Sequence, residues 1–96
     1  LKGVTLIPYY TNTEPSYWLY TMKVERRDEF IKMMEKNGII ASPLHLRNDR
    51  HTIFHNESIL TPNLDKFYES FVHIPCGWWL SEEDRDFIVE VIRKGW

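Results

Sequence analysis

Two side chains near the middle of the sequence have the types needed to bind an anionic ligand. His45 and Arg47 stand two residues apart after an extended segment, so on a continuing strand both would point to the same side. Arginine binds phosphate or carboxylate through a fork of N–H donors, and histidine adds a hydrogen bond. The alternative is an exposed loop in which Asp49 and Arg50 form weak, solvated ion pairs. Because charged loops are common, the residue types alone favour this alternative.

Histidine and cysteine spacings raise two further kinds of site, a metal centre and a nucleophile. His51 and His55 would share one face of a helix, and His73 stands three residues before Cys76. Neither pair has the glutamate of a zinc-protease helix or paired Cys-x-x-Cys ligands, so we expect no metal site and interpret the loop histidines as solvated. No third group orients His73 as a base, so we expect Cys76 to be a small structural residue.

Aromatic residues make up 15% of the chain and include four tryptophans. Neighbouring side chains on an extended backbone face opposite ways, so we expect Trp78 or Trp79 to meet a ligand or a partner surface. Trp18, Tyr20 and Met22 alternate along one expected strand. With a single basic neighbour they are not typical of a base-stacking platform, and we interpret them as core.

The elements that must position these side chains alternate between strand and helix patterns. Period-two alternation predicts a strand over residues 17–24, and helical spacing predicts a helix over 28–36 that ends at Asn37-Gly38. A further extended run over 39–41 is ended by Pro43, which completes a strand–helix–strand frame.

The second half of the chain begins with a long loop. Residues 45–62 show little periodicity, and we expect a loop there with one helical turn. A helix is predicted over 63–71 and a short strand over 72–75. The last helix is predicted to start at the capping residue Ser81. Its expected buried face consists of Phe87, Ile88, Val91 and Ile92.

These elements predict an α+β fold, a two-layer sandwich with a small antiparallel or mixed sheet of about three strands and about three helices. Residues 1–15 are expected to form a connecting segment from an upstream domain, with 4–7 either a strand or the end of that linker. Residues 16–96 are expected to form the domain itself. We therefore interpret the chain as a piece of a longer protein.

Composition excludes several classes of protein. The formal net charge is −2, from 12 Lys and Arg against 14 Asp and Glu, without the positive excess typical of a nucleic-acid binder. No apolar run approaches the length of a membrane span, and one cysteine cannot form an intrachain disulfide. We expect a cytoplasmic protein that binds neither nucleic acid nor membrane.

The order of the motifs resembles the C-terminal part of the DegT/StrS family, pyridoxal-phosphate (PLP)-dependent aminotransferases that act on nucleotide-linked keto sugars. The likeness covers residues 4–96. It is carried by residues 17–24, 27–30, 37–40, 45–47, 61–66, 72–79 and 80–88. The Gly77-Trp78-Trp79 sequence and the His45-to-Asp49 sequence are similar to a perosamine-synthase-like branch.

The resemblance implies the small C-terminal domain of a fold type I aminotransferase. In that family the lysine that holds PLP lies upstream, so we expect no catalytic residue in this chain and PLP only in the whole enzyme. The family segment that matches His45 and Arg47 borders the active-site cleft. The resemblance therefore implies that these two side chains, and less directly Trp78 and Trp79, face the substrate.

For the whole enzyme, the resemblance implies a homodimer that transfers an amino group, with glutamate as the expected donor, to a nucleotide-linked keto sugar. The alternative is a freestanding, non-enzymatic module whose aromatic surface docks a protein partner.

Overall fold

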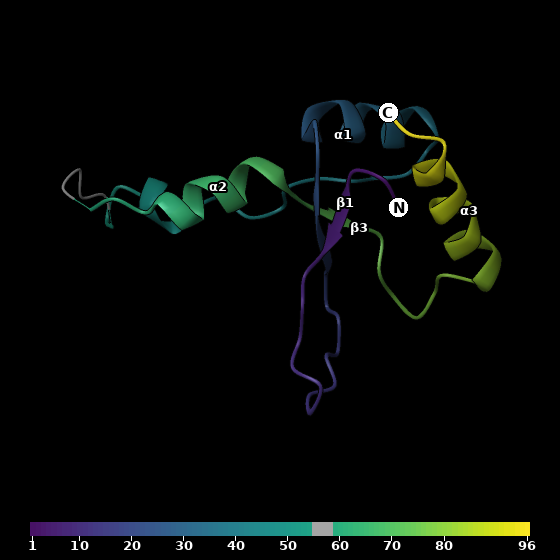
Figure 1. Cartoon of the computed structure of the whole chain (residues 1–96), viewed down its shortest axis with the longest axis horizontal. Coiled ribbons are helices and arrows are strands. Elements are labelled where there is room, and N and C mark those ends of the chain that lie inside the picture. Colours follow the sequence, from purple (N-terminus) through teal and green to yellow (C-terminus); the bar gives the residue numbers. More distant parts are fainter. Residues whose placement is uncertain (55–58) are drawn as a thin grey trace.

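The sheet at the centre of the molecule has three antiparallel strands in the order β1-β2-β3 (Figure 1). The computed structural model describes residues 1–54 and 59–96. Its strands are β1 (Val4–Leu6), β2 (Tyr20–Val24) and β3 (Phe71–Ile74). Its α-helices are α1 (Arg27–Lys36), α2 (Pro62–Ser70) and α3 (Glu82–Arg93). The predicted α+β fold is confirmed.

The register of β2 and β3 divides their side chains between two faces of the sheet. Met22 lies opposite Val72, and Thr21 lies opposite His73. Since successive side chains on a strand point to opposite faces, Met22 and Val72 belong to one face and Thr21 and His73 to the other. The first face is apolar, and the second carries the buried histidine.

Helices α1 and α3 cover the apolar face. Phe30 and Met34 of α1 are fully buried, and the core continues through Ile88, Val91 and Ile92 of α3. These α1 and α3 positions recur at helical spacing, which is why each helix has one buried face.

Both predicted helix boundaries with capping signals are confirmed. At the end of α1, Gly38 has a φ of 73°, and the N–H of Ile39 donates to the carbonyl of Met34 at 3.0 Å. Glycine adopts this left-handed conformation without steric cost. At the start of α3, Ser81 and Asp84 form a reciprocal capping box.

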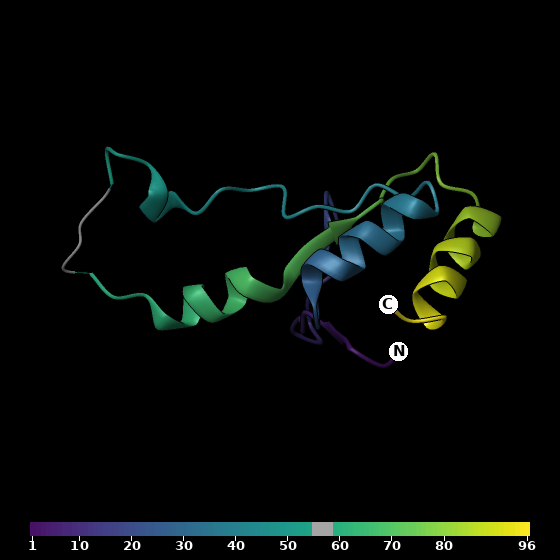
Figure 2. The same ribbon diagram turned by 90° about the horizontal axis from the view of Figure 1, so that it is seen from above.

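Helix α2 and the segment around residues 48–50 project away from the sheet and together form an arm (Figure 2). The arm contains the predicted single helical turn, a 3₁₀ turn at Asn48–Arg50. Helix α2 continues directly into β3, so the arm is joined to an edge strand of the sheet without a loop.

The predicted strand at residues 17–24 is wrong at its start. Pairing begins at Tyr20, and Tyr17 has a φ of 44°, a left-handed conformation that interrupts an extended strand. As a result Trp18 is 79% exposed rather than part of the core, whereas Met22 is buried as expected.

The predicted strand at residues 39–41 is also wrong. Ile39 and Ala41 are buried, but the segment joins the sheet only through one isolated bridge, between Ser42 and His73. Pro43 follows that bridge directly. Since proline has no N–H to donate, it ends the pairing.

Two further expectations concern the edges of the fold. Phe87 is 51% exposed, because one residue step turns about 100° around a helix and Ile88, Val91 and Ile92 already fill the side that faces the core. Residues 4–6, placed within the connecting segment, form β1, which pairs with β2. The connection to an upstream domain stays a prediction.

Within residues 1–54 and 59–96, no helix combines the length and the apolar character needed to cross a membrane.

Candidate functional site

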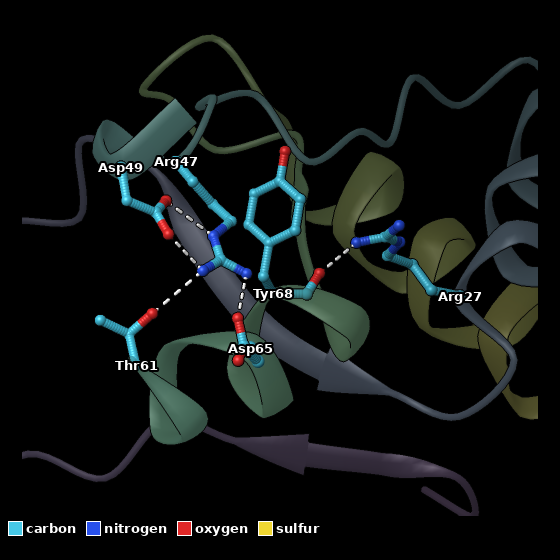
Figure 3. Close-up of polar contacts among 6 residues, drawn as sticks. All are labelled: Arg27, Arg47, Asp49, Thr61, Asp65 and Tyr68. Carbon is cyan, nitrogen blue, oxygen red and sulfur yellow. Dashed lines mark hydrogen bonds and ion pairs between the residues drawn. The ribbon is translucent and has the colours of Figure 1, made fainter. Parts of the chain in front are cut away.

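The structure places His45 and Arg47 in two different surroundings. The exposed ring of His45 lies next to Trp18 and His73, with ring centres 6.0 Å and 5.7 Å away. Arg47 is only 8% exposed and lies where the 3₁₀ turn meets α2 (Figure 3). The two side chains that the sequence grouped therefore make separate sets of contacts.

Arg47 is held by three side chains of this chain. Its Nε donates to Oδ1 of Asp49 at 2.9 Å and its Nη2 to Oδ2 at 2.5 Å, the two-pronged geometry that arginine forms with a carboxylate. Nη1 donates to Asp65, and Nη2 also donates to Oγ1 of Thr61 at 3.1 Å. These bonds join the 3₁₀ turn to the start of α2.

The cluster contains one arginine and two aspartate side chains. The hydrogen bond from Arg47 holds the pKa of Asp49 below its ordinary value, and the bonds to Asp49 and then Asp65 raise the pKa of Arg47. Arg47 and Asp49 are therefore both charged at neutral pH, and four of the five N–H donors of Arg47 are engaged. This geometry favours a role in holding the arm, while a contact between Arg47 and a substrate stays a prediction.

The ring of Tyr68 lies between two guanidinium groups and connects the arm to α1. Its centre is 5.7 Å from Cζ of Arg47 and 5.8 Å from Cζ of Arg27. Arg27 also donates a hydrogen bond to the carbonyl of Tyr68 (Figure 3). Cation–π contacts of this kind attract the arginines to the ring. Sequence reasoning missed these partners, because no local spacing links Arg47 with Asp65 or with Arg27.

His73 lies beneath His45 on the second face of the sheet. It is 8% exposed, its Nδ1 is hydrogen-bonded to Oγ1 of Thr21 at 2.9 Å, and its ring meets that of His45 edge-on at 77°. Burial, and then the neighbouring His45, lower the pKa of His73, so its neutral form is favoured. The sequence indicated His73 only as a metal ligand or base, and gave no signal of this contact.

Trp78 and Trp79 lie in the loop between β3 and α3. Trp78 is 94% exposed, and the two rings contact each other edge-on at 6.2 Å. The ring of Trp79 covers Gly77 so closely that a Cβ there would come within 2.3 Å of it. The thiol of Cys76 donates to the carbonyl of Tyr17 at 3.1 Å, which ties this loop to the segment that precedes β2. Any contact of the two tryptophans with a substrate stays a prediction.

Metal ligands are not gathered in the part of the chain that the structure describes: no three His, Cys, Asp or Glu side chains come together there. His55, one half of the first histidine pair, lies outside the described residues.

The six lysines of the chain lie in surroundings that do not suit covalent binding of PLP. A lysine that binds PLP covalently is activated by a desolvated or cationic environment. All six lie in the described residues; Lys23 is half-buried and the others are exposed. They are Lys2, Lys23, Lys32, Lys36, Lys66 and Lys94. None therefore fits the group.

Comparison with known proteins finds matches among solved structures. No protein-family model matches the sequence, and no curated protein matches it significantly. The sugar aminotransferase CalS13 from Micromonospora echinospora is 38% identical with a TM-score of 0.93, over 100% of this chain and 26% of that one. AtS13 from Actinomadura melliaura is 38% identical with a TM-score of 0.91, over 98% and 25%.

A more distant match shares the fold. A DegT DnrJ EryC1 StrS aminotransferase from Brucella abortus is 22% identical with a TM-score of 0.82, over 96% of this chain and 26% of that one. Over its whole length, the chain thus has the structure of the C-terminal quarter of DegT/DnrJ/EryC1/StrS sugar aminotransferases, a PLP-dependent family. The predicted resemblance is confirmed. The chain spans about a quarter of the length of these relatives.

Proposed function

We propose that this chain is the C-terminal domain of a PLP-dependent aminotransferase that transfers an amino group, with glutamate as donor, to a nucleotide-linked keto sugar. The observation that carries the proposal is the match to a sugar aminotransferase at 38% identity and a TM-score of 0.93 over the whole chain. Such agreement in both sequence and backbone supports a shared role for the domain. The whole enzyme is proposed to act as a cytoplasmic homodimer.

The catalytic centre is proposed to lie outside this chain. Bound PLP would supply the amino-transfer chemistry, and the whole enzyme would supply its binding and orientation. Because none of the six lysines here is buried, the lysine that holds PLP is assigned to the three-quarters of the enzyme that this chain does not span.

Exposed apolar side chains support a further part of the protein packed against this one. Trp78, Ile40 and Tyr10 are each more than four-fifths exposed. Contiguous apolar surface marks an interaction site in soluble proteins, and the groove that Trp78 borders together with Leu6, Tyr20 and Ile88 is such a surface. A freestanding docking module would show the same exposure, and the match to an aminotransferase domain favours the missing large domain as the occupant.

Within the enzyme, His45 is proposed to contact the substrate and Arg47 to position the arm that carries it. His45 is exposed and offers a ring nitrogen for hydrogen bonding, whereas the guanidinium of Arg47 is engaged by Asp49 and Asp65. Both residues lie on one segment, so an arm displaced by loss of Arg47 would also displace His45.

The reading frame that precedes Leu1 provides the test. The full polypeptide would be expressed and assayed with glutamate and a panel of dTDP-, UDP- and GDP-linked keto hexoses, following 2-oxoglutarate release and the amino sugar by mass spectrometry. The proposal expects one of these sugars to be aminated. A start codon close to Leu1, or a full polypeptide that aminates only free keto acids, would contradict it.

A further inference from the structure

We propose that His73 is a positioning residue that fixes the ring of His45, the side chain assigned above to substrate contact. This inference rests on the proposed function for its kinetic consequence, but the geometry that supports it does not. His45 belongs to a segment without regular pairing beyond Ser42, so its orientation must come from side-chain contacts.

Two rings flank His45 and limit its movement. Trp18 lies on one side, with ring centres 6.0 Å apart and planes tilted by 48°. His73 lies on the other, at 5.7 Å and 77°, in the edge-to-face arrangement that aromatic rings prefer. Trp18 is largely exposed, whereas His73 is buried at the centre of a strand. Of the two rings that contact His45, the less mobile one is therefore that of His73.

His73 is itself held by both backbone and side chain. Its N–H donates to the carbonyl of Ser42 at 2.9 Å, and the N–H of Ser42 donates back to its carbonyl at 3.1 Å. The hydrogen bond with Thr21 limits rotation of its ring. The ring of Phe71, two residues earlier on the same strand, packs edge-on against it with ring centres 5.4 Å apart. The bridge at Ser42 lies three residues before His45, so His73 anchors the segment as well as the ring.

Packing alone does not explain a histidine at this position. The Nε2 atom of His73 is buried and has no hydrogen-bond partner among the described residues. A buried polar atom without a partner costs stability, and an apolar strand-forming residue would fill the same space without that cost. The neighbouring strand positions Phe71 and Val72 are apolar. The contact with His45 gives this costly side chain a function.

Steady-state kinetics of the full enzyme test the inference with the keto sugar that turns over in the panel above. His45→Ala is expected to lower kcat/KM by about 10-fold, the loss of one hydrogen bond. His73→Val removes the ring and keeps a strand-forming residue, and we expect a loss of about fivefold. The double variant should lose no more than His45→Ala alone, because His73 acts through His45. His73→Phe keeps a ring against His45 but loses the hydrogen bond to Thr21 that limits rotation of that ring, so its loss of kcat/KM should lie between wild type and His73→Val.

A matched control separates positioning from general destabilisation. Val72→Ala removes a fully buried side chain from the adjacent position of β3, on the opposite face. It should lower the melting temperature without the loss of kcat/KM seen for His73→Val. Losses that multiply in the double variant, or a Val72→Ala enzyme as slow as His73→Val, would overturn the inference.

Crystal structures of the wild-type and His73→Val full enzymes keep the two proposals distinguishable. We expect the His45 ring to leave its contact with Trp18 in the variant. An unmoved ring would overturn the positioning role whatever the activity. A displaced ring in an enzyme that aminates no nucleotide-linked sugar would contradict the proposed function and leave the positioning role standing.

Discussion

At the scale of single residues, the structure places the two predicted site side chains in different surroundings. His45 is exposed between two rings, while Arg47 is buried against Asp49, Asp65 and Thr61. Residue types and spacing singled out the pair but favoured a solvated loop, and the family resemblance implied a place at the substrate cleft. The sequence could not show that the carboxylate of Asp65, eighteen residues away, pairs with the guanidinium of Arg47, because that contact depends on how the arm folds.

The role of Arg47 is tested by comparing variants that remove it with variants that remove its partner. In the full enzyme, Arg47→Ala and Asp65→Asn should each lower both the melting temperature and kcat/KM, because both break the link between the 3₁₀ turn and α2. Arg50→Ala, an exposed charge in the same turn, should change neither.

Direct contact between Arg47 and substrate predicts a different pattern. Loss of a charge-assisted contact would lower kcat/KM by roughly 10–150-fold in Arg47→Ala with the melting temperature unchanged. Asp65→Asn would then leave substrate binding intact, since the arginine would remain. Parallel kinetics and thermal melts decide between the two roles.

The lowered pKa of His73 predicts that the folded protein loses stability in acid. Below a pH near 6.5, an unfolded histidine takes up a proton that the buried His73 resists. The free energy of unfolding should therefore fall as the pH drops from 7 towards the pKa of the folded state. His73→Phe should show a smaller decrease in urea titrations over this range, and an equal decrease would contradict the assignment.

At the scale of elements, local signals with a steric basis were the dependable ones. Gly38 and Ser81 mark helix ends that the structure places within a residue of the prediction, because capping is decided by local backbone geometry. Strand limits depend on pairing with distant segments. Pro43 follows the single bridge at Ser42, so residues 39–41 form no regular strand. The left-handed conformation of Tyr17 turns the backbone before β2 begins.

The cap of α3 can be tested by removing one hydroxyl. Ser81 accepts a hydrogen bond from the N–H of Asp84 at 3.0 Å, satisfying a donor that the helix itself leaves free. Ser81→Ala should therefore lower the free energy of unfolding by about 1 kcal/mol. Ser16→Ala, at an exposed serine outside the helices, is the matched control. Equal denaturation midpoints for the two variants would show that the cap contributes nothing.

At the scale of the whole molecule, the chain has the structure of one quarter of an aminotransferase and exposes apolar surface accordingly. A groove of about 560 Å³ between the sheet and α3 is lined by Leu6, Tyr20, Trp78 and Ile88 among others. The order of short motifs was enough to place the domain. The sequence of this domain could not identify the sugar or the nucleotide, because only His45 and its neighbours are assigned to the cleft.

The chain on its own is expected to show no PLP chemistry. The 96-residue chain, mixed with PLP and reduced with borohydride, should yield no single lysine labelled to stoichiometry and no amino transfer, since none of its lysines is buried. Low, scattered labelling of the exposed lysines is the expected background, and peptide mapping by mass spectrometry measures it.

The full polypeptide, reduced with borohydride in the presence of PLP and mapped by mass spectrometry, gives the most direct test of the central claim. We predict one stoichiometrically labelled lysine, encoded upstream of Leu1, in an enzyme that aminates a nucleotide-linked keto sugar. Stoichiometric labelling of Lys23 or of any other lysine between Leu1 and Trp96 would contradict the claim that this domain borders a catalytic centre located elsewhere in the enzyme.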